Sequence, residues 1–339
     1  MPAHVVTQAE ARAACEEAYA GQEDLLRLLR VFDRSGVERR HFAFPIPYYL
    51  EERSFEERNA DWIEQGTALA ERAARGCLER AGVRPEEVDL LYFVTTTGLA
   101  TPSLDALLVP RLGLRRDVRR FPLFGLGCAG GAGGLLRASE ALKARPKHRA
   151  LVVSVELCGQ VFSRQAATPV DVVGAALFGD GAAAALVAGD EAAGQGPRFL
   201  ASQAVLFDGT QDLMGWDFTS DGLRLVLSEK VTDFVRTRLR PAVDQFLGSA
   251  ALTIRNLDFW ALHPGGRRVL EAYREAFGAS EKTLEWTTRS LSSVGNLSSA
   301  SVLFVLRDIL ERGNARPGDK ALVLALGPGF AAEMSVLVW

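Results

Sequence analysis

The chain has 339 residues, of which 48% are hydrophobic and 24% charged, and its formal net charge at neutral pH is -3. This composition is typical of a globular protein, and the length predicts about two domains or two halves. The balanced charge gives no polycationic footprint for nucleic acid and no basic amphipathic segment for a membrane surface. No apolar run reaches the roughly 18 residues that span a bilayer, and the N-terminus lacks a secretory pattern. We expect a cytoplasmic protein that binds neither nucleic acid nor membrane.

Cysteine and histidine spacing indicates neither a disulfide framework nor a metal site. Four cysteines are too few for such a framework in a long chain, and none lies at metal-ligand spacing from the four histidines. We therefore expect reduced thiols and no bound metal. The residues concerned are Cys15, Cys77, Cys128 and Cys158, with His4, His41, His148 and His263.

The segment LLRLLRVFDRSGVERR, residues 25–40, carries Arg27, Arg30 and Arg34 at the spacing i, i+3, i+7. This spacing predicts a helix with all three guanidinium groups on one face. Taken alone, such a face is ordinarily a solvated charged surface.

Farther along, the chain repeats one pattern. Residues 67–82 predict a helix, and VDLLYFVTTTG (88–98) predicts a buried strand that ends in a polar loop. After a connecting loop at 188–198, a helix at 230–248 and the segment LDFWALHPGG (257–266) have the same form.

Each half then continues through a turn of small residues, an apolar-periodic helix, a basic loop and a β-branched strand. Asp89 precedes Cys128 by 39 residues, and Asp258 precedes Asn296 by 38. Two copies about 168 residues apart predict an internally duplicated α/β fold whose sheets are covered by helices. Ligands of open α/β sheets bind at the carboxyl ends of strands, so we expect Cys128, Asn296 and His263 to converge.

The turn FGLGCAGGAGG (124–134) has more than one interpretation. Gly125 to Gly130 fits the dinucleotide fingerprint G-x-G-x-x-G, but the candidate acid Glu156 follows Gly130 by 26 residues, where about 20 is usual. Alternatively, a helix N-terminus lowers the pKa of Cys128 and makes it a nucleophile whose own N–H faces an oxyanion. For a lone cysteine, a buried structural role is the third possibility.

His263 and Asn296 complete the candidate chemistry. His263 ends an apolar strand before Pro264–Gly266, and Asn296 occupies the turn that holds Cys128 in the first half. Individually, a core histidine and an asparagine helix cap are the plain alternatives. Together, a thiolate can take an acyl group from a thioester, and His and Asn can stabilise the enolate left by decarboxylation of a second thioester. Attack of that enolate on the acyl-cysteine forms a carbon–carbon bond.

These motifs resemble the thiolase-like condensing enzymes, and among them the chalcone synthase-like type III polyketide synthases. GCAGG, HPGGRRVLEA, GNLSSASVLFVL and GPGF match the nucleophile, histidine, asparagine and C-terminal glycine segments of that family, over nearly the whole chain. The resemblance implies duplicated βαβαβ halves, residues 1–200 and 201–339, in α/β/α/β/α layers. It also implies a homodimer that uses acyl-CoA and malonyl-CoA as substrates and needs no cofactor.

The resemblance further implies roles for single residues. Cys128 would carry the acyl group, while His263 and Asn296 act in decarboxylation and condensation. LFGDGAA makes Phe178 a gatekeeper between the CoA tunnel and an inner cavity. The other substrate and CoA residues implied are Gly327 and Gly329 of the glycine loop, and Arg27, Arg30 and Arg34 for CoA phosphates.

Three positions depart from plant chalcone synthases. Leu225 stands in place of a second gatekeeper Phe, Cys158 in place of a threonine, and Thr101 in place of a methionine that reaches into the partner's cavity. This less aromatic cavity is similar to that of bacterial members that make pyrones, resorcinols or phloroglucinols, and a fatty acyl starter is our hypothesis. The starter, the number of extensions and the ring closure stay open.

Rivals remain within the same fold. A β-ketoacyl carrier-protein synthase III uses the same three residues but usually carries HQAN and GNTSAAS. A degradative thiolase needs a second, C-terminal cysteine, and none follows Cys158. A non-catalytic acyl-binding relative is disfavoured because all three polar residues are present.

Overall fold

Two mixed sheets form the centre of the protein, in a computed structural model that describes residues 1–162, 167–192, 194 and 196–339. The first sheet has the order β4 (Arg119–Leu123), β3 (Leu90–Val94), β5 (Arg149–Leu157), β6 (Asp180–Ala188). The second has the order β10 (Phe259–Leu262), β11 (Lys320–Gly327), β12 (Ala331–Val338), β7 (Arg198–Leu206). In both, a parallel pair is followed by an antiparallel strand: β3, β5 and β6 correspond to β10, β11 and β12.

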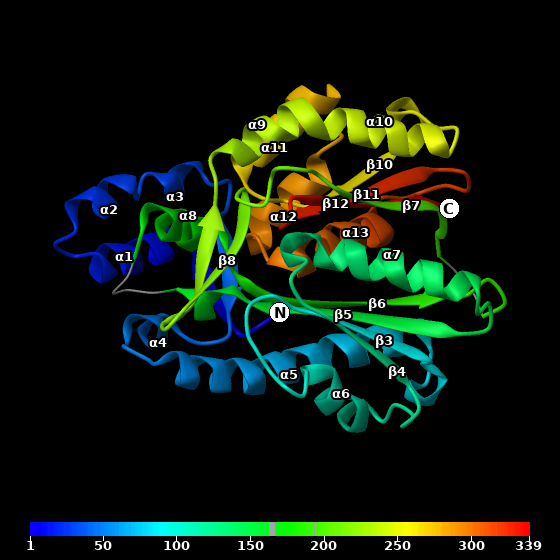
Figure 1. Ribbon diagram of the computed structural model, residues 1–339, viewed down its shortest axis with the longest axis horizontal. Coiled ribbons are helices and arrows are strands. Elements are labelled where there is room, and N and C mark those ends of the chain that lie inside the picture. The colour runs from blue at the N-terminus through cyan, green and yellow to red at the C-terminus, as the bar shows by residue number, and fades with distance from the viewer. Residues whose placement is uncertain (163–166, 193, 195) are drawn as a thin grey trace.

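Helices and sheets alternate in five layers, as predicted (Figure 1). α7 (Gly130–Lys143) and α13 (Ser301–Arg312) lie between the two sheets and share one core cluster with both of them. α5 (Phe55–Ala81) and α6 (Leu104–Leu112) cover the outer face of the first sheet. α9 (Lys230–Phe234), α10 (Arg240–Ser249) and α11 (Arg267–Phe277) cover the second sheet.

The glycines that begin α7 allow the two central helices to meet. Gly130, Gly131, Gly133 and Gly134 are all buried in its first two turns. A Cβ atom at Gly131 would overlap the carbonyl oxygen of Ser299, which precedes α13. The absence of a side chain therefore brings the equivalent turns of the two halves into contact.

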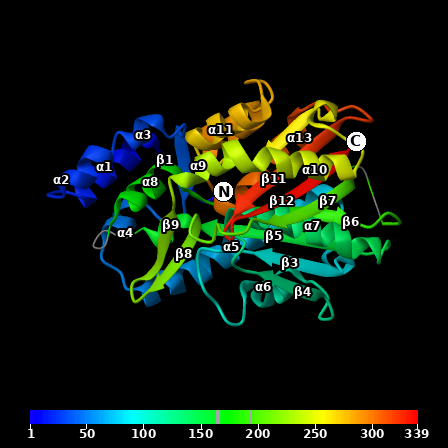
Figure 2. The ribbon, with the colours of Figure 1, turned by 45° about the horizontal axis from the view of Figure 1, so that its top comes forward.

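Smaller elements extend from the five layers (Figure 2). β1 (His4–Thr7) pairs with β2 (Arg39–Phe42), and the helices between them, α1 (Gln8–Ala18), α2 (Glu23–Leu28) and α3 (Val31–Arg34), share a core cluster with α8 (Pro169–Leu177). β8 (Met214–Thr219) and β9 (Gly222–Leu227) form a separate hairpin. The remaining helices are α4 (Ile46–Leu50) and α12 (Glu285–Val294).

Two helix predictions need correction. The single helix expected at 25–40 is wrong: α2 ends at Leu28 and α3 begins at Val31. Leu25, Leu29 and Phe32 still bury their side chains in one cluster across the break, so the apolar face of the segment is kept while the helix is interrupted. The helix expected at 230–248 forms, but Val235–Leu239 is a π-helical turn between α9 and α10.

The other expected helices and strands are present. α5 begins earlier than residue 67, at a capping box formed by Ser54 and Glu57, and ends at Gly82 in the left-handed conformation (φ 63°). Within the described part of the chain, no helix is long and apolar enough to cross a membrane.

Candidate active site

A cavity of about 690 Å3 collects residues from both halves of the chain. Its lining includes eight of the residues predicted from the sequence: Arg30, Arg34, Cys128, Cys158, Phe178, Leu225, His263 and Asn296. The expected convergence of the cysteine, histidine and asparagine segments is therefore present in the structure.

Cys128 lies on a sharp turn between β4 and α7. Its turn is the short 3-10 helix η2 (Gly127–Ala129), and Gly127 has a positive φ of 48°, which favours glycine. A Cβ atom at Gly127 would lie 2.5 Å from the Cδ of Pro328, so the C-terminal glycine loop packs directly against the nucleophile turn. The sulfur atom lies 3.6 Å from the hydroxyl oxygen of Ser298.

The side chain of Asn296 is held in one orientation. Its Oδ1 accepts hydrogen bonds from the backbone N–H of Ser298 (2.8 Å) and from the hydroxyl of Ser301 (3.3 Å). Nδ2 is left as the donor, with one long contact of 3.5 Å to the carbonyl oxygen of Gly265. Asn296 thus caps the turn that follows it, which is the structural role considered for it in the sequence. Its side-chain amide also lines the cavity with Nδ2 as a hydrogen-bond donor.

His263 follows β10 directly and lines the same cavity while being almost fully buried. Its main-chain N–H donates to the carbonyl of Leu324, which fixes the residue against the neighbouring strand β11. Among the described residues, its Nδ1 has no hydrogen-bond partner. Tyr273 packs beside it and donates to the carbonyl oxygen of His263 at 3.4 Å.

Burial keeps the two reactive groups uncharged. Burial raises the pKa of the Cys128 thiol to about 12, while the Ser298 hydroxyl acts in the opposite direction. Burial lowers the pKa of His263 to about 3. The expectation of a lowered cysteine pKa is therefore wrong, because desolvation outweighs the hydrogen bond. A neutral thiol and a neutral imidazole face the cavity at pH 7.

Glu156 lies beneath the nucleophile turn with no exposed surface. Its carboxyl group accepts hydrogen bonds from the N–H of Thr96 (3.0 Å), the hydroxyl of Thr97 (2.9 Å) and the hydroxyl of Ser299. Burial raises its pKa to about 7, and these donors oppose the shift. A carboxyl group enclosed in this way cannot bind the ribose of a dinucleotide, so the alternative interpretation of the glycine turn has no acid to complete it.

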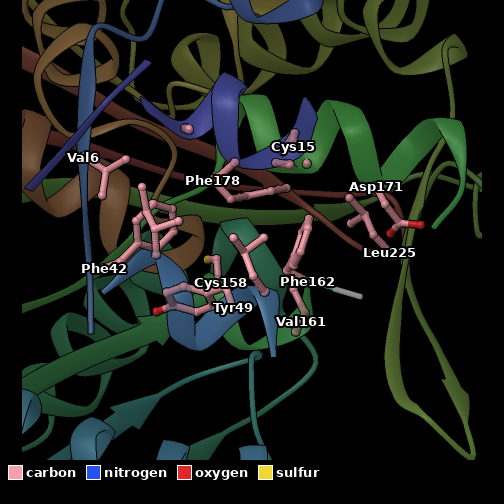
Figure 3. Close-up of a pocket in the computed structure, with 17 residues that line it drawn as sticks. Val6, Cys15, Phe42, Tyr49, Cys158, Val161, Phe162, Asp171, Phe178 and Leu225 are labelled. Carbon is pink, nitrogen blue, oxygen red and sulfur yellow. The ribbon is translucent and has the colours of Figure 1, made fainter. Parts of the chain in front are cut away.

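A second, smaller cavity of about 90 Å3 adjoins the first (Figure 3). Cys158, Phe178 and Leu225 line both cavities and so form the boundary between them. The rest of its lining is mostly apolar: Val6, Ala11, Ala14, Cys15, Phe42, Ile46, Leu50, Val161, Phe162 and Ala175. The Tyr49 hydroxyl donates to Asp180 and the Asp171 carboxylate caps α8, so its polar groups have other partners.

Arginines gather where the main cavity opens. Arg30 and Arg34 line it together with Arg267 and Arg268, two residues of the quoted HPGGRRVLEA segment that the sequence analysis did not single out. Arg267 pairs with Glu271 at 3.2 Å. Arg27 is exposed outside this lining, and its guanidinium lies 3.7 Å from the carboxylate of Asp24 on the same helix, α2.

Three further predicted residues lie outside the lining. Gly327 packs against the nucleophile turn, where a Cβ atom would lie 2.7 Å from the Cβ of Ala129. Gly329 has a φ of 131° and lies against Leu206. Thr101 is exposed on the surface of the single chain.

Sequence reasoning missed several residues of the cavity. Ser298 follows Asn296 by two positions within a quoted motif, yet nothing in the motif shows that its hydroxyl faces the cysteine. Thr96 and Trp216 also line the cavity and are joined by a hydrogen bond of 3.1 Å. No group of three or more metal-ligating side chains occurs among the described residues.

Comparison with known proteins finds relatives along the whole chain. Residues 46–191 and 199–338 match the N-terminal and C-terminal domains of the family described as chalcone and stilbene synthases. A 1,3,6,8-tetrahydroxynaphthalene synthase of Streptomyces peucetius subsp. caesius is 42% identical over 319 residues, covering 93% of this chain and 84% of that protein. A putative chalcone synthase of Bacillus subtilis (strain 168) is 36% identical, covering 100% of this chain and 96% of that protein.

Solved structures agree with these relatives. The crystal structure of 1,3,6,8-tetrahydroxynaphthalene synthase from Streptomyces coelicolor A3(2), a bacterial type III polyketide synthase, matches with a TM-score of 0.95 at 29% identity. The match covers 100% of this chain and 96% of that one.

The chain therefore belongs to the chalcone and stilbene synthase family. It is a type III polyketide synthase with the thiolase-like fold, an acyltransferase that forms carbon–carbon bonds from CoA thioesters. The resemblance seen in the sequence motifs is confirmed, and the alternative of a carrier-protein synthase III is not favoured.

Proposed function

We propose that the enzyme transfers the acyl group of a starter acyl-CoA to Cys128 and extends it with units from malonyl-CoA, before closing a pyrone, resorcinol or phloroglucinol-type ring. The observation that carries this proposal is the meeting of Cys128, His263 and Asn296 at one cavity. The two halves of the chain, residues 1–200 and 201–339, contribute the nucleophile and the two donors respectively. CoA thioesters are the substrates, and the chemistry calls for no further cofactor.

Acyl transfer begins with the thiol of Cys128. As the sulfur attacks the starter carbonyl, its proton passes to the neutral imidazole of His263, and CoA leaves as its thiol after protonation. A lone thiolate is costly in this buried place, whereas transfer within the pair creates two opposite charges together. The hydroxyl of Ser298 supports the developing negative charge on sulfur.

Decarboxylation uses His263 and Asn296 as donors to the thioester oxygen of malonyl-CoA. Loss of CO2 leaves an enolate, whose negative oxygen is stabilised by the N–H groups of the two side chains. The enolate carbon then attacks the acyl carbonyl on Cys128, and the cysteine sulfur leaves. The product is a CoA thioester longer by two carbons, ready to return to Cys128 for another round.

The arginines at the opening of the cavity are proposed to hold the phosphates of CoA. Arg30, Arg34, Arg267 and Arg268 present planar donor groups that suit phosphate oxygens. Arg27 lies outside this group, so the CoA-phosphate contact expected for it from the sequence is not part of the proposal.

The smaller cavity is proposed to accept the apolar tail of the starter. Its volume of about 90 Å3 and its mostly apolar lining suit a run of methylene groups rather than a polar group. Burial of each methylene there contributes about 0.8 kcal/mol. This supports the fatty acyl starter hypothesis.

A homodimer is proposed from the exposed edge of the first sheet. β4 is one of the two edge strands of this sheet, and Phe121 within it and Phe124 just after it are 36% and 45% exposed. Apolar side chains along an unpaired edge favour pairing with another chain. A second copy would also cover the surface near Thr101. Light scattering of the purified protein tests this: a mass near the monomer value of 36.7 kDa would contradict it.

The test of the proposed function is an incubation with malonyl-CoA and a panel of acyl-CoA starters, with products identified by mass spectrometry. We expect polyketide products that disappear in the Cys128→Ala variant. Product formation by that variant, or no product from the unmodified enzyme with any starter, would refute the proposal.

A further inference from the structure

The hairpin β8–β9 forms one wall of the main cavity although it belongs to neither central sheet. Within the part of the chain that the structure describes, its two strands pair only with each other. Five of its residues line the cavity: Met214, Gly215, Trp216, Leu225 and Leu227. Figures 1 and 2 show the hairpin extending away from the second sheet toward α4 and the beginning of α5. Its position must therefore be set by contacts made along its length.

Two side-chain hydrogen bonds connect this hairpin to the rest of the described chain. Trp216 donates from Nε1 to the hydroxyl of Thr96 at 3.1 Å, in the middle of the hairpin. At the tip, the guanidinium of Arg58 donates to the carbonyl oxygen of Asp221. Phe55, one turn before Arg58 on α5, lies against Gly222. The start of α5 is thus the anchor of the hairpin tip.

The same guanidinium holds a second segment of the cavity wall. Another nitrogen of Arg58 donates to the carbonyl oxygens of Gln160 (2.9 Å) and Phe162 (3.4 Å). Gln160 belongs to the short 3-10 helix η3 (Cys158–Val161), which carries Cys158. One planar fork therefore joins the segment of Cys158 to the hairpin of Leu225.

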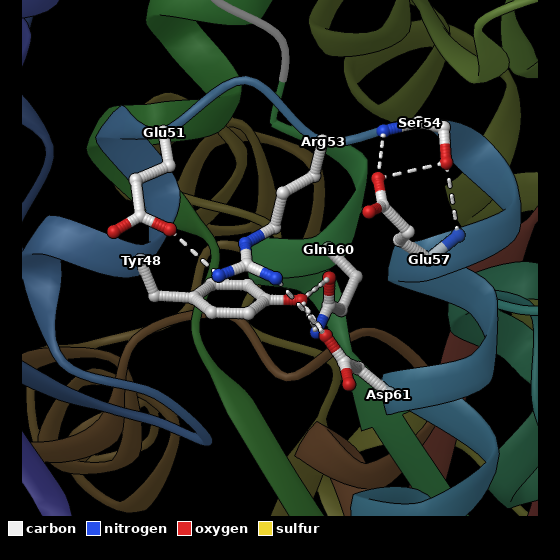
Figure 4. A network of polar contacts seen from close by, with 7 residues as sticks. All are labelled: Tyr48, Glu51, Arg53, Ser54, Glu57, Asp61 and Gln160. Carbon is white, nitrogen blue, oxygen red and sulfur yellow. Dashed lines mark hydrogen bonds and ion pairs between the residues drawn. The ribbon is translucent and has the colours of Figure 1, made fainter.

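η3 is fixed from its other side as well. The Gln160 side chain donates from Nε2 to the hydroxyl of Tyr48 at 3.2 Å, and this hydroxyl donates to Asp61 at 2.5 Å (Figure 4). The N–H of Gly159 donates to Asp180 at 2.8 Å. With η3 fixed by these groups, the Arg58 bonds hold the hairpin relative to η3.

We propose that Arg58 is a positioning residue that fixes the boundary between the two cavities and thereby sets which starter lengths the enzyme accepts. Cys158 and Leu225 form that boundary with Phe178, and Arg58 joins the two segments that carry them. The inference rests on the proposed use of acyl-CoA starters. It assigns Arg58 no contact with the substrate.

The variants Arg58→Lys and Arg58→Ala test the proposal. Lys keeps the charge but has a single nitrogen, so it cannot bind both segments as the guanidinium does. Arg72→Ala is the matched control: Arg72 lies on the same helix, α5, where its guanidinium donates to the carbonyl oxygen of Met1, and no hydrogen bond among those of the described residues joins it to the hairpin or to η3.

The functional readout is the ratio of kcat/KM for octanoyl-CoA to that for acetyl-CoA. This ratio does not depend on the fraction of active enzyme, so a loss of stability alone leaves it unchanged. A loosened boundary discriminates less, and we expect the ratio to move toward one by about tenfold in both Arg58 variants, the effect of one charged hydrogen bond. An unchanged ratio in Arg58→Lys, or the same change in Arg72→Ala, would overturn the proposal.

Hydrogen exchange provides a readout that needs no activity. Amides of residues 214–227 should exchange faster in Arg58→Lys than in the unmodified protein and Arg72→Ala, while those of the central strands stay protected. Unaltered hairpin exchange would refute the anchor itself. If no starter gives product but the hairpin exchanges faster, the proposed function is refuted while the anchoring of the hairpin by Arg58 is supported. The proposed effect of Arg58 on starter length is then refuted together with the proposed function.

Discussion

The hydroxyl oxygen of Ser298 lies 3.6 Å from the sulfur of Cys128, although 170 positions separate the two residues in the chain. The two residues come from equivalent turns, one before each central helix. The glycines of α7 allow this approach, because a side chain at Gly131 would overlap Ser299. The internal duplication of the sequence thus supplies a nucleophile from one copy and its hydrogen-bond partner from the other.

Ser298→Ala should slow the reaction of Cys128 with iodoacetamide. The hydroxyl lowers the pKa of the thiol against the effect of burial, so its removal shifts the pH dependence of alkylation to higher pH. One hydrogen bond to a developing thiolate predicts a loss of about tenfold at a given pH. Ser293→Ala, on α12, is the control. Equal alkylation rates for both variants would show that the Ser298 contact is irrelevant to reactivity.

Asn296→Asp should separate the two half-reactions. The aspartate keeps an oxygen that accepts from Ser298 and Ser301, but it replaces the donor Nδ2 with a second acceptor. We expect acyl transfer to Cys128 to persist, while release of CO2 from malonyl-CoA falls by about 100-fold or more. Radiolabelled CO2 and intact-protein mass measure the two steps. A variant that decarboxylates normally would exclude Asn296 as an enolate donor.

Glu156→Gln should change the pH dependence of stability. The folded-state pKa of Glu156 is raised to about 7 from the ordinary 4.5, so the folded protein holds its proton more tightly than the unfolded chain. Stability linked to this group is therefore present below pH 4.5 and lost as pH rises to 7. The glutamine variant has no such loss, because its amide does not titrate, and its oxygen can accept from Thr96 and Thr97 as Oε2 of Glu156 does.

Urea unfolding at several pH values measures this effect. The difference in free energy of unfolding, unmodified protein minus variant, should fall by up to about 3 kcal/mol between pH 4.5 and 7.5. A difference that stays constant over this interval would contradict the raised pKa.

Ala14→Leu should shorten the starter that the enzyme accepts. Ala14 lines the smaller cavity from α1, so a larger side chain fills space proposed for the acyl tail. We expect kcat/KM for octanoyl-CoA to fall by about tenfold, the effect of displacing one or two buried methylenes, with acetyl-CoA unaffected. Ala13→Leu is the control, since Ala13 is exposed on the same helix. Equal losses for both starters would refute the assignment of this cavity.

The sequence predicts the features that depend on periodicity and repetition. Equal spacing in the two halves is enough to predict that Cys128, His263 and Asn296 lie close together, because equivalent strands end at equivalent edges of the sheets. The break between α2 and α3 could not be predicted, since Leu25, Leu29 and Phe32 keep the i, i+4, i+7 spacing of a continuous helix across it. Ser298 and Arg58 were also missed. The role of Ser298 depends on its left-handed backbone conformation (φ 48°), and that of Arg58 on hydrogen bonds to main-chain carbonyl oxygens. Neither feature can be predicted from the spacing of residue types.

The direction of the cysteine pKa shows a different limit of sequence reasoning. A helix N-terminus is visible in a sequence and predicts a lowered pKa. The desolvation that raises the pKa of Cys128 to about 12 depends on groups from distant segments that close over the sulfur.

The most direct test of the account is the mass of the protein after brief incubation with an acyl-CoA starter in the absence of malonyl-CoA. We predict an increase equal to one acyl group, located by peptide mapping on the tryptic peptide that contains Cys128, and absent in Cys128→Ala. Cys158→Ala, which removes the other thiol of the same cavity, should still be acylated. Acylation at any other residue, or an acylated Cys128→Ala protein, would contradict the central claim.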